Sequence, residues 1–174
     1  MRKKLLLTCL LLICAAGISA QSLLGQWEAQ MKEDKMNMTI ILDIKDNNKM
    51  SFTVNAAMAE ENSMDMRFHI IVNGDYTRKD DILNLIFDQN EENVELKIDD
   101  IKFYGEAEEL AKANPETGKF VRQMLEQQLE KSKGDFVKEL PTNGEMKILQ
   151  LTNTTLKLQS TDDEDKDTLE FTRK

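Results

Sequence analysis

The sequence predicts a mainly β protein built from antiparallel strands, with helices confined to one insertion late in the chain. Two observations carry this prediction. Between residues 36 and 76, apolar residues occupy alternate positions, which is the period of strands with one buried face. From about residue 106 to residue 133, the apolar residues instead fall three and four positions apart, which is the period of an amphipathic helix.

The alternating stretch consists of three segments separated by polar residues. The separators, residues 46–48 and 60–63, contain Asn, Asp and Ser, which favour tight reversals of the chain. The segments are therefore predicted to form an antiparallel meander whose even-numbered residues face a core. These inward residues are Met36, Met38, Ile40, Leu42, Ile44, Met50, Phe52, Val54, Ala56, Met58, Met64, Met66, Phe68, Ile70, Val72 and Tyr76.

Further strands are predicted on both sides of the meander. A first strand within residues 21–31 begins its apolar face with Trp27, the only tryptophan. Leu83, Leu85 and Phe87 alternate with Asn84, Ile86 and Asp88 in a later strand. In the next strand Val94, Leu96 and Ile98 are expected to point inward. The alternation then shifts by one residue across Asp99 and Asp100, to Ile101 and Phe103, as it does at a β-bulge. Three final strands, at residues 146–151, 156–158 and 169–171, bring the predicted total to about nine.

The helical insertion reads as a short helix followed by a longer one. The short helix covers residues 106–113, and the longer helix begins at Pro115 with Asn114 as its cap, because asparagine accepts hydrogen bonds at helix starts and proline fits the first turn. Gly134 is the predicted end of the longer helix. Phe136, Val137 and Leu140 are then expected to form an apolar segment after it.

Residues 1–20 are predicted to be a secretory signal peptide. Three basic residues precede an apolar run at positions 5–14, and Ala20 offers a small residue for cleavage before Gln21. The apolar run is too short to span a bilayer. We therefore expect export, to the periplasm or outside the cell.

Both cysteines lie within this segment, so the mature protein is expected to contain none. Lipid attachment at Cys14 is the less favoured alternative, because Leu12 and Ile13 stand where a bacterial lipoprotein needs small residues.

The charge balance excludes two classes of partner. The chain carries 23 basic and 32 acidic residues, for a formal net charge of −9, and removal of the three basic residues of the signal peptide leaves −12. Such a surface repels nucleic acid and anionic lipid headgroups. We therefore expect no nucleic-acid partner. No other hydrophobic segment is long enough to cross a bilayer, so we expect no stable membrane insertion, and the sequence identifies no protein partner.

Many sequential antiparallel strands with one apolar face must either stack as two sheets or roll into a barrel, which removes exposed edges. A resemblance favours the barrel. Four short motifs are similar to those of small secreted lipocalin-like proteins of bacteria: Gly25-x-Trp27, Gly74-Asp75-Tyr76, Leu151-Thr152 leading into Leu156-x-Leu158, and Phe171-Thr172-Arg173. The resemblance implies a calycin-type, up-and-down antiparallel β-barrel over residues 21–174, from which the helical insertion is a departure.

The same resemblance implies a structural pair at the barrel floor. In lipocalins the tryptophan of the first motif closes the floor, and a basic side chain from near the last strand crosses its ring. Residue parity agrees, since Arg173 shares odd positions with Leu169 and Phe171, which are expected to point inward. Trp27 and Arg173 are therefore the predicted pair, and a cation over the indole contributes about 0.5–2 kcal/mol.

Enzymatic function is poorly supported by the sequence. The only histidine, His69, has outward parity, no cysteine remains after cleavage, and no serine lies in a nucleophile-elbow motif, so the usual catalytic triads cannot be assembled. We expect no enzyme, no catalytic residues and no cofactor, although the abundant carboxylates leave a paired-carboxylate hydrolase open.

The methionines allow two interpretations. Met36 with Met38, and Met64 with Met66, form Met-x-Met pairs of inward parity, and thioethers are soft ligands that suit Cu(I). Methionine is also a flexible filler of apolar interiors, and strand periodicity alone produces the same spacing. We therefore expect core residues and no metal site, with copper binding as the less favoured alternative.

Together these observations predict an exported lipocalin-like binding protein that holds a small apolar ligand inside the barrel. The alternative is a barrel filled by its own side chains that acts as a structural or protein-interaction module through its acidic surface or its helix. Independently of this choice, the apolar residues of the longer helix are expected to bury against the outside or mouth of the barrel: Phe120, Val121, Met124, Leu125 and Leu129. The residues expected to line the cavity are Trp27, Phe52, Val54, Met66, Phe68, Ile70, Leu83, Leu85 and Leu96.

Overall fold

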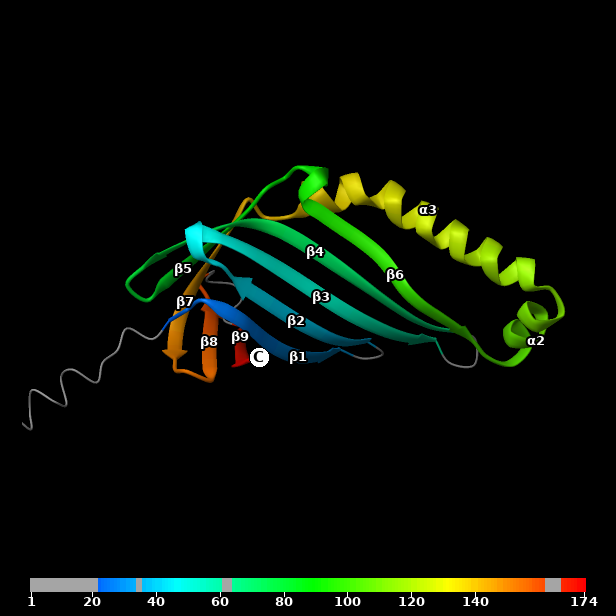
Figure 1. Cartoon of the computed structure of the whole chain (residues 1–174), viewed down its shortest axis with the longest axis horizontal. Coiled ribbons are helices and arrows are strands. Elements are labelled where there is room, and N and C mark those ends of the chain that lie inside the picture. The colour runs from blue at the N-terminus through cyan, green and yellow to red at the C-terminus, as the bar shows by residue number, and fades with distance from the viewer. Residues whose placement is uncertain (1–21, 34–35, 61–63, 162–166) are drawn as a thin grey trace, which may run out of the picture.

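Nine antiparallel strands and two α-helices make up the structure, a computed structural model that describes residues 22–33, 36–60, 64–161 and 167–174 (Figure 1). The predicted signal peptide lies outside these residues. The strands are β1 (Gly25–Glu33), β2 (Met36–Ile44), β3 (Lys49–Glu60), β4 (Met64–Lys79), β5 (Ile82–Phe87), β6 (Val94–Phe103), β7 (Asn143–Leu151), β8 (Thr155–Ser160) and β9 (Thr168–Arg173). The helices are α2 (Gly105–Ala113) and α3 (Pro115–Glu139), and the short 3-10 turns η1 (Asp46–Asn48) and η2 (Glu91–Asn93) precede β3 and β6.

Eight of the strands close into an antiparallel barrel, as the sequence predicted. Around the ring the order is β1, β2, β3, β4, β5, β7, β8 and β9, and β9 returns to pair with β1. The registers of β2 with β3 and of β3 with β4 pair the even-numbered residues of the meander with one another. Because paired residues share a face of the sheet, this register places all of them on the inner face.

β6 is the one described strand outside the ring, and its position results from a change of partner along β4. The long strand β4 pairs with β3 along one edge. Its other edge pairs with β6 from Met64 to Val72 and with β5 from Gly74 to Lys79. The barrel is therefore closed only beside the second half of β4.

Gly74 stands where β4 changes partner. A Cβ atom at this position would lie 2.2 Å from the backbone oxygen of Ile86 on β5 and 3.0 Å from the Met50 side chain. Contacts this short do not occur in folded proteins, so the approach of β5 to β4 requires glycine here. This gives a physical reason for the glycine of the Gly74-Asp75-Tyr76 motif.

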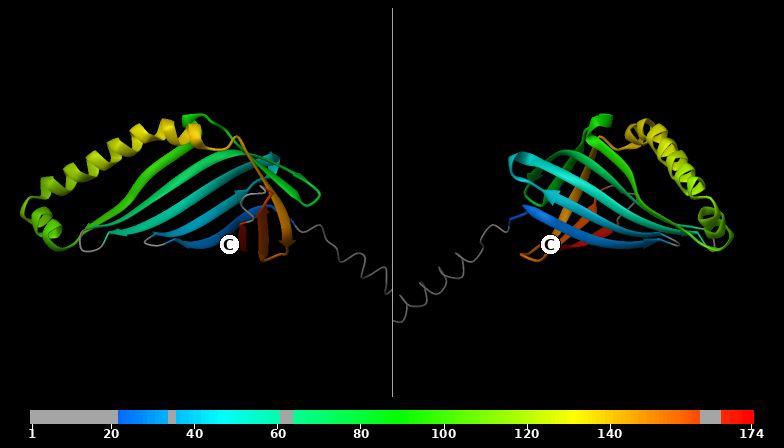
Figure 2. Two further views of the ribbon diagram at one scale, coloured as in Figure 1. Left: turned by 180° about the vertical axis from the view of Figure 1, so that it is seen from behind. Right: turned by 45° about the vertical axis from the view of Figure 1, so that its right-hand side comes forward.

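Beyond the closed half, the sheet continues as an open trough. β9 pairs with β1 only at Trp27 and Glu28, whereas β1 and β2 remain paired as far as Glu33 and Met36. In Figure 1, β1 to β4 and β6 run together toward α2, well past the ends of β5 and β7 to β9. The two further views in Figure 2 show the curvature of this sheet and α3 running along the β6 side.

α3 begins as predicted but continues past its predicted end. The Asn114 side chain accepts a hydrogen bond from the backbone N–H of Glu116 at 3.2 Å, and Pro115 occupies the first turn. The helix then passes through Gly134 and ends at Glu139. Mid-helix glycine costs about 1 kcal/mol, and burial of Val137, which is only 3% exposed, offsets that cost.

The core is divided between the two halves. The larger cluster fills the closed half and includes Trp27, Leu83, Leu156 and Phe171. The smaller cluster joins Val72 and Val94 to Val137 of α3, so the end of the helix closes the junction between barrel and trough. Phe87 packs against both clusters.

Candidate functional site

Packed side chains occupy the interior of the closed half of the barrel. Its largest fully buried side chains are Trp27, Phe171, Leu42, Ile44, Met50, Leu83, Leu156 and Leu158. Of the predicted cavity-lining residues, Trp27, Leu83 and Leu85 belong to this core, and Phe52 and Val54 pack against it. These five residues therefore lie in one packed core, where the prediction had placed them around a ligand cavity.

Arg173 covers the tryptophan at the barrel floor. Its guanidinium carbon lies 4.2 Å from the centroid of the Trp27 ring, and its two terminal nitrogens donate hydrogen bonds to the backbone oxygens of Leu24 (2.8 Å) and Ser22 (2.6 Å). Gly25 has a φ of +120°, and a Cβ there would lie 3.1 Å from the guanidinium. The Gly25-x-Trp27 motif thus makes room for the arginine, which ties the last strand to the segment before β1.

A pocket of about 320 Å³ lies between α3 and the open part of the sheet. Its walls come from β4, β6 and α3, and none of the side chains that line it is charged. The lining residues are Met66, Phe68, Ile98, Leu125, Gln128, Leu129 and Ser132. Three other hollows on the described surface include charged residues in their lining, for example one beside Lys45, Asp75 and Asp88, so this pocket is the best candidate for an apolar ligand.

The local sequence explains why these side chains converge. Phe68 of β4 pairs with Ile98 of β6, so both lie on the inner face. Leu125 and Leu129 are four residues apart on α3, as are Gln128 and Ser132, and such spacing places each pair on one side of a helix. The pocket therefore has an apolar floor with an uncharged polar edge along the helix.

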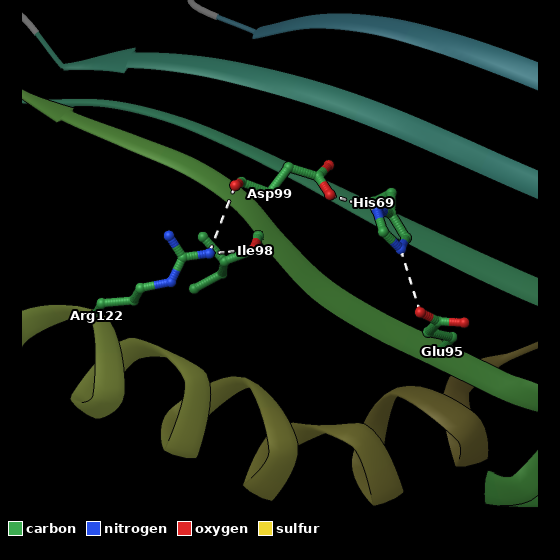
Figure 3. Close-up of polar contacts among 5 residues, drawn as sticks. All are labelled: His69, Glu95, Ile98, Asp99 and Arg122. Carbon is green, nitrogen blue, oxygen red and sulfur yellow. Dashed lines mark hydrogen bonds and ion pairs between the residues drawn. The ribbon is translucent and has the colours of Figure 1, made fainter. Parts of the chain in front are cut away.

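Contacts near both ends of α3 hold it over the sheet and leave the pocket between them. At one end Val137 is buried against Val72 and Val94. Nearer the start of the helix, the Arg122 side chain donates hydrogen bonds to the backbone oxygens of Ile98 (2.8 Å) and Asp99 (3.5 Å) (Figure 3). The pocket-lining part of α3, from Leu125 to Ser132, lies between these anchors.

The carbonyls that Arg122 binds lie at the β-bulge predicted from the phase slip. Arg67 pairs with Asp100 and Phe68 with Ile98, which leaves Asp99 as the extra residue. A bulge interrupts the ladder and frees backbone groups. The predicted bulge is thereby confirmed, and its freed carbonyls provide the attachment site for α3.

His69 belongs to a polar network at the bulge, shown with Arg122 in Figure 3. Its Nδ1 lies 2.8 Å from a carboxylate oxygen of Asp99, and its Nε2 lies 3.5 Å from Glu95. Nearby, Arg67 donates a 2.7 Å hydrogen bond to Asp100 and lowers the pKa of that carboxyl. Since odd-numbered His69 lies on the face opposite Phe68, this network supports the sheet from outside and does not contact the pocket.

Methionines extend the inner face of the trough beyond the pocket. Met58 of β3 pairs with Met36 of β2 and with Met66 of β4, and Met31 pairs with Met38 one row closer to the barrel. All five are partly exposed. The Met66 side chain both lines the pocket and belongs to this row, so the pocket opens onto a methionine surface.

The remaining predicted lining residues divide between pocket and junction. Met66 and Phe68 line the pocket, whereas Ile70 and Leu96 pack around the Val72, Val94 and Val137 cluster. The prediction did not include Ile98 or the helix residues of the pocket among the site residues. The spacing of Leu125 and Leu129 was the sequence signal for them, but it indicated an apolar helix face without showing what that face covers.

Part of that helix face is uncovered in the structure. Phe120 is 66% exposed and Met124 is 48% exposed, as is Leu110 of α2 at 64%. The expectation that Phe120 and Met124 bury against the barrel is therefore wrong. The helix contacts the sheet through Arg122 and Val137. Phe120 and Met124 take no part in that contact and remain exposed.

Comparison with protein-family models gives no match, and comparison with curated proteins gives none either. Within the described residues, no three His, Cys, Asp or Glu side chains are grouped as they would be around a metal ion. In the same residues, neither helix is long and apolar enough to cross a membrane.

Proposed function

We propose that this chain is an exported, non-enzymatic protein that binds a small apolar ligand in the pocket between α3 and the sheet. The observation that carries this proposal is the pocket itself: about 320 Å³, lined by five apolar side chains, one amide and one hydroxyl. Small-molecule sites are typically concave, mostly apolar and 300–1,000 Å³ in volume, with a few polar groups. The signal-peptide pattern at residues 1–20 supports export.

The pocket is a better site than the closed interior that the lipocalin resemblance implies. Trp27, Leu83 and Leu156 are fully buried there, and a ligand would have to displace packed side chains at a cost of several kcal/mol. Beneath α3, by contrast, a ligand would cover side chains such as Met66 and Phe68 that are already partly exposed. Their burial stabilises the complex at about 25 cal/mol per Å².

A neutral fluorescent probe tests the proposal directly. N-phenyl-1-naphthylamine, which brightens in apolar sites, is expected to bind the mature protein saturably. Ser132→Trp, which places an indole in the pocket, should weaken that binding at least tenfold. Gln123→Trp is the matched control, because Gln123 is exposed on the same helix and does not line the pocket.

The two variants distinguish binding in the pocket from binding elsewhere on the protein. If both variants bind like the wild type, the probe occupies another site and the proposal is wrong. Equal weakening in both would point to the helix as a whole, and the pocket would again lose its role.

Cu(I) binding is the second candidate, favoured by the row of Met36, Met58 and Met66 on adjacent strands. Three thioethers on one face are a possible soft-metal ligand set. Met58→Leu distinguishes the two functions, because leucine keeps the apolar volume but removes the sulfur. A titration against a Cu(I) chelator should show loss of copper binding in this variant if copper is the ligand, whereas probe binding should survive if the ligand is apolar.

A further inference from the structure

The pocket lies between a buried part of α3 and an exposed part. Its inner end meets the cluster formed by Val72, Val94 and Val137, where Val137 is only 3% exposed. Its outer end faces the start of α3, where Met124 and Phe120 are exposed. A ligand longer than the pocket can therefore extend along the exposed start of α3.

This direction follows one stripe of α3. Phe120, Met124, Gln128 and Ser132 recur every four residues, so each is the neighbour of the next in a stripe that winds around the surface of α3. Their 12-residue span corresponds to about 18 Å at 1.5 Å per residue. With a volume near the lower limit for small-molecule sites, this shape accommodates one extended chain.

The polar atoms of the pocket are uncharged. Gln128 and Ser132 are its only polar lining residues, and the Ser132 hydroxyl already donates to the backbone oxygen of Leu129 at 2.8 Å. The Gln128 amide can both donate and accept a hydrogen bond. Moving a carboxylate onto this surface without a paired cation would be costly, whereas a hydroxyl would be satisfied.

The cations at this end of the molecule lie outside the pocket lining. Arg122 pairs with Glu126 at 2.9 Å, and Lys119 pairs with Glu116 at 2.9 Å. Lys131 is exposed on the helix next to Ser132 but does not line the pocket. Because it is exposed beside Ser132, Lys131 is a cation that an anionic ligand at the pocket could reach, so the test includes it.

We propose that the ligand is a single-chain amphiphile with an uncharged polar group, whose chain lies on Met66, Phe68, Leu125 and Leu129 and whose polar group hydrogen-bonds to Gln128. This inference rests on the proposed function, since it names the ligand class of the same pocket. It excludes fatty-acid anions as the preferred ligand.

Displacement of N-phenyl-1-naphthylamine by 1-alkanols and by decanoate at pH 8 tests the inference. Affinity should rise about fourfold for each methylene added between 1-hexanol and 1-decanol. Gln128→Leu should weaken 1-decanol binding about two- to tenfold, the loss expected for one neutral hydrogen bond, after the probe affinity of the variant has been measured in its own titration. Gln127→Leu, the same change one residue away and outside the pocket, should alter neither.

Lys131→Gln gives the decisive contrast. We expect it to leave 1-decanol binding unchanged and decanoate binding weak. If decanoate binds the wild type as tightly as 1-decanol, the inference is overturned, and a loss of decanoate affinity in Lys131→Gln would identify Lys131 as the cation that binds it. If Gln128→Leu binds 1-decanol like the wild type, the polar contact is refuted while the proposed function stands. If the probe itself does not bind the wild type, the proposed function fails first.

Discussion

Replacement of Arg173 by alanine should open the floor of the barrel. The guanidinium makes three interactions, the contact with the Trp27 ring at 4.2 Å and the hydrogen bonds to the backbone oxygens of Ser22 and Leu24. A cation over an aromatic ring contributes about 1 kcal/mol at a partly exposed site. Each charged hydrogen bond contributes about 1 kcal/mol after allowance for solvent. The expected loss in the free energy of unfolding is therefore about 3 kcal/mol.

This loss corresponds to a fall in melting temperature of about 6–12 °C for a chain of this size. Fluorescence provides a second measurement, because Trp27 is the only tryptophan and is fully buried. Water reaching the uncovered ring should shift its emission to longer wavelength. Arg173→Lys should lose less stability, because an ammonium keeps the cation over the ring but cannot reproduce the planar geometry that reaches both carbonyls.

Arg78→Ala is the matched control for Arg173→Ala. Arg78 is exposed at the end of β4 and bonds only to the backbone oxygen of Asp80 in the described structure, so its loss should change the free energy of unfolding by less than about 0.5 kcal/mol. The reasoning is refuted if the two alanine variants melt within about 2 °C of each other and Trp27 emission is the same in both.

Three further substitutions test other contacts. Gly74→Ala should lower the free energy of unfolding in urea by about 3 kcal/mol, because its Cβ would collide with a backbone oxygen of β5, whereas Gly144→Ala, with its nearest contact at 3.9 Å, should be nearly neutral. The hydrogen bond from Lys174 holds the pKa of Glu28 below its ordinary value of 4.5, so its stabilisation is present above pH 4.5 and is lost as the pH falls through the lowered value. Glu28→Gln should therefore reduce the acid-dependent fall in melting temperature below pH 5. Arg122→Ala should increase amide hydrogen exchange in α3 while exchange in the barrel strands stays unchanged.

The meander could be predicted because one local rule governs it. Alternation of apolar residues decides which face of a strand is buried, and a slip of one residue would reverse every side chain. The same rule located the bulge at Asp99, where the phase changes within one strand. The start of α3 was equally local, since Asn114 and Pro115 define it through their own backbone chemistry.

The open half could not be predicted, because it depends on which strands pair. Nothing in the sequence of β4 shows that its edge is shared by β6 and β5, and Gly74 indicates the change only once the approach of Ile86 is known. The extent of α3 was missed for a related reason. Gly134 is a sound local signal for a helix end, and the tertiary burial of Val137 outweighs it.

The main core lies in the closed half of the barrel and the pocket lies in the open half. Substitutions in the closed half should therefore affect stability, and substitutions in the pocket should affect probe binding. Leu156 is fully buried in the closed half, so Leu156→Ala should lower the free energy of unfolding by about 2–5 kcal/mol and leave probe affinity unchanged in the folded fraction. Phe68 is partly exposed in the pocket, so Phe68→Ala should cost less than half as much stability and weaken probe binding severalfold. Urea unfolding and probe titration on both variants measure the two effects. Loss of probe binding in folded Leu156→Ala would mean that the ligand reaches the closed interior after all, and the assignment of binding to the open half would then be wrong.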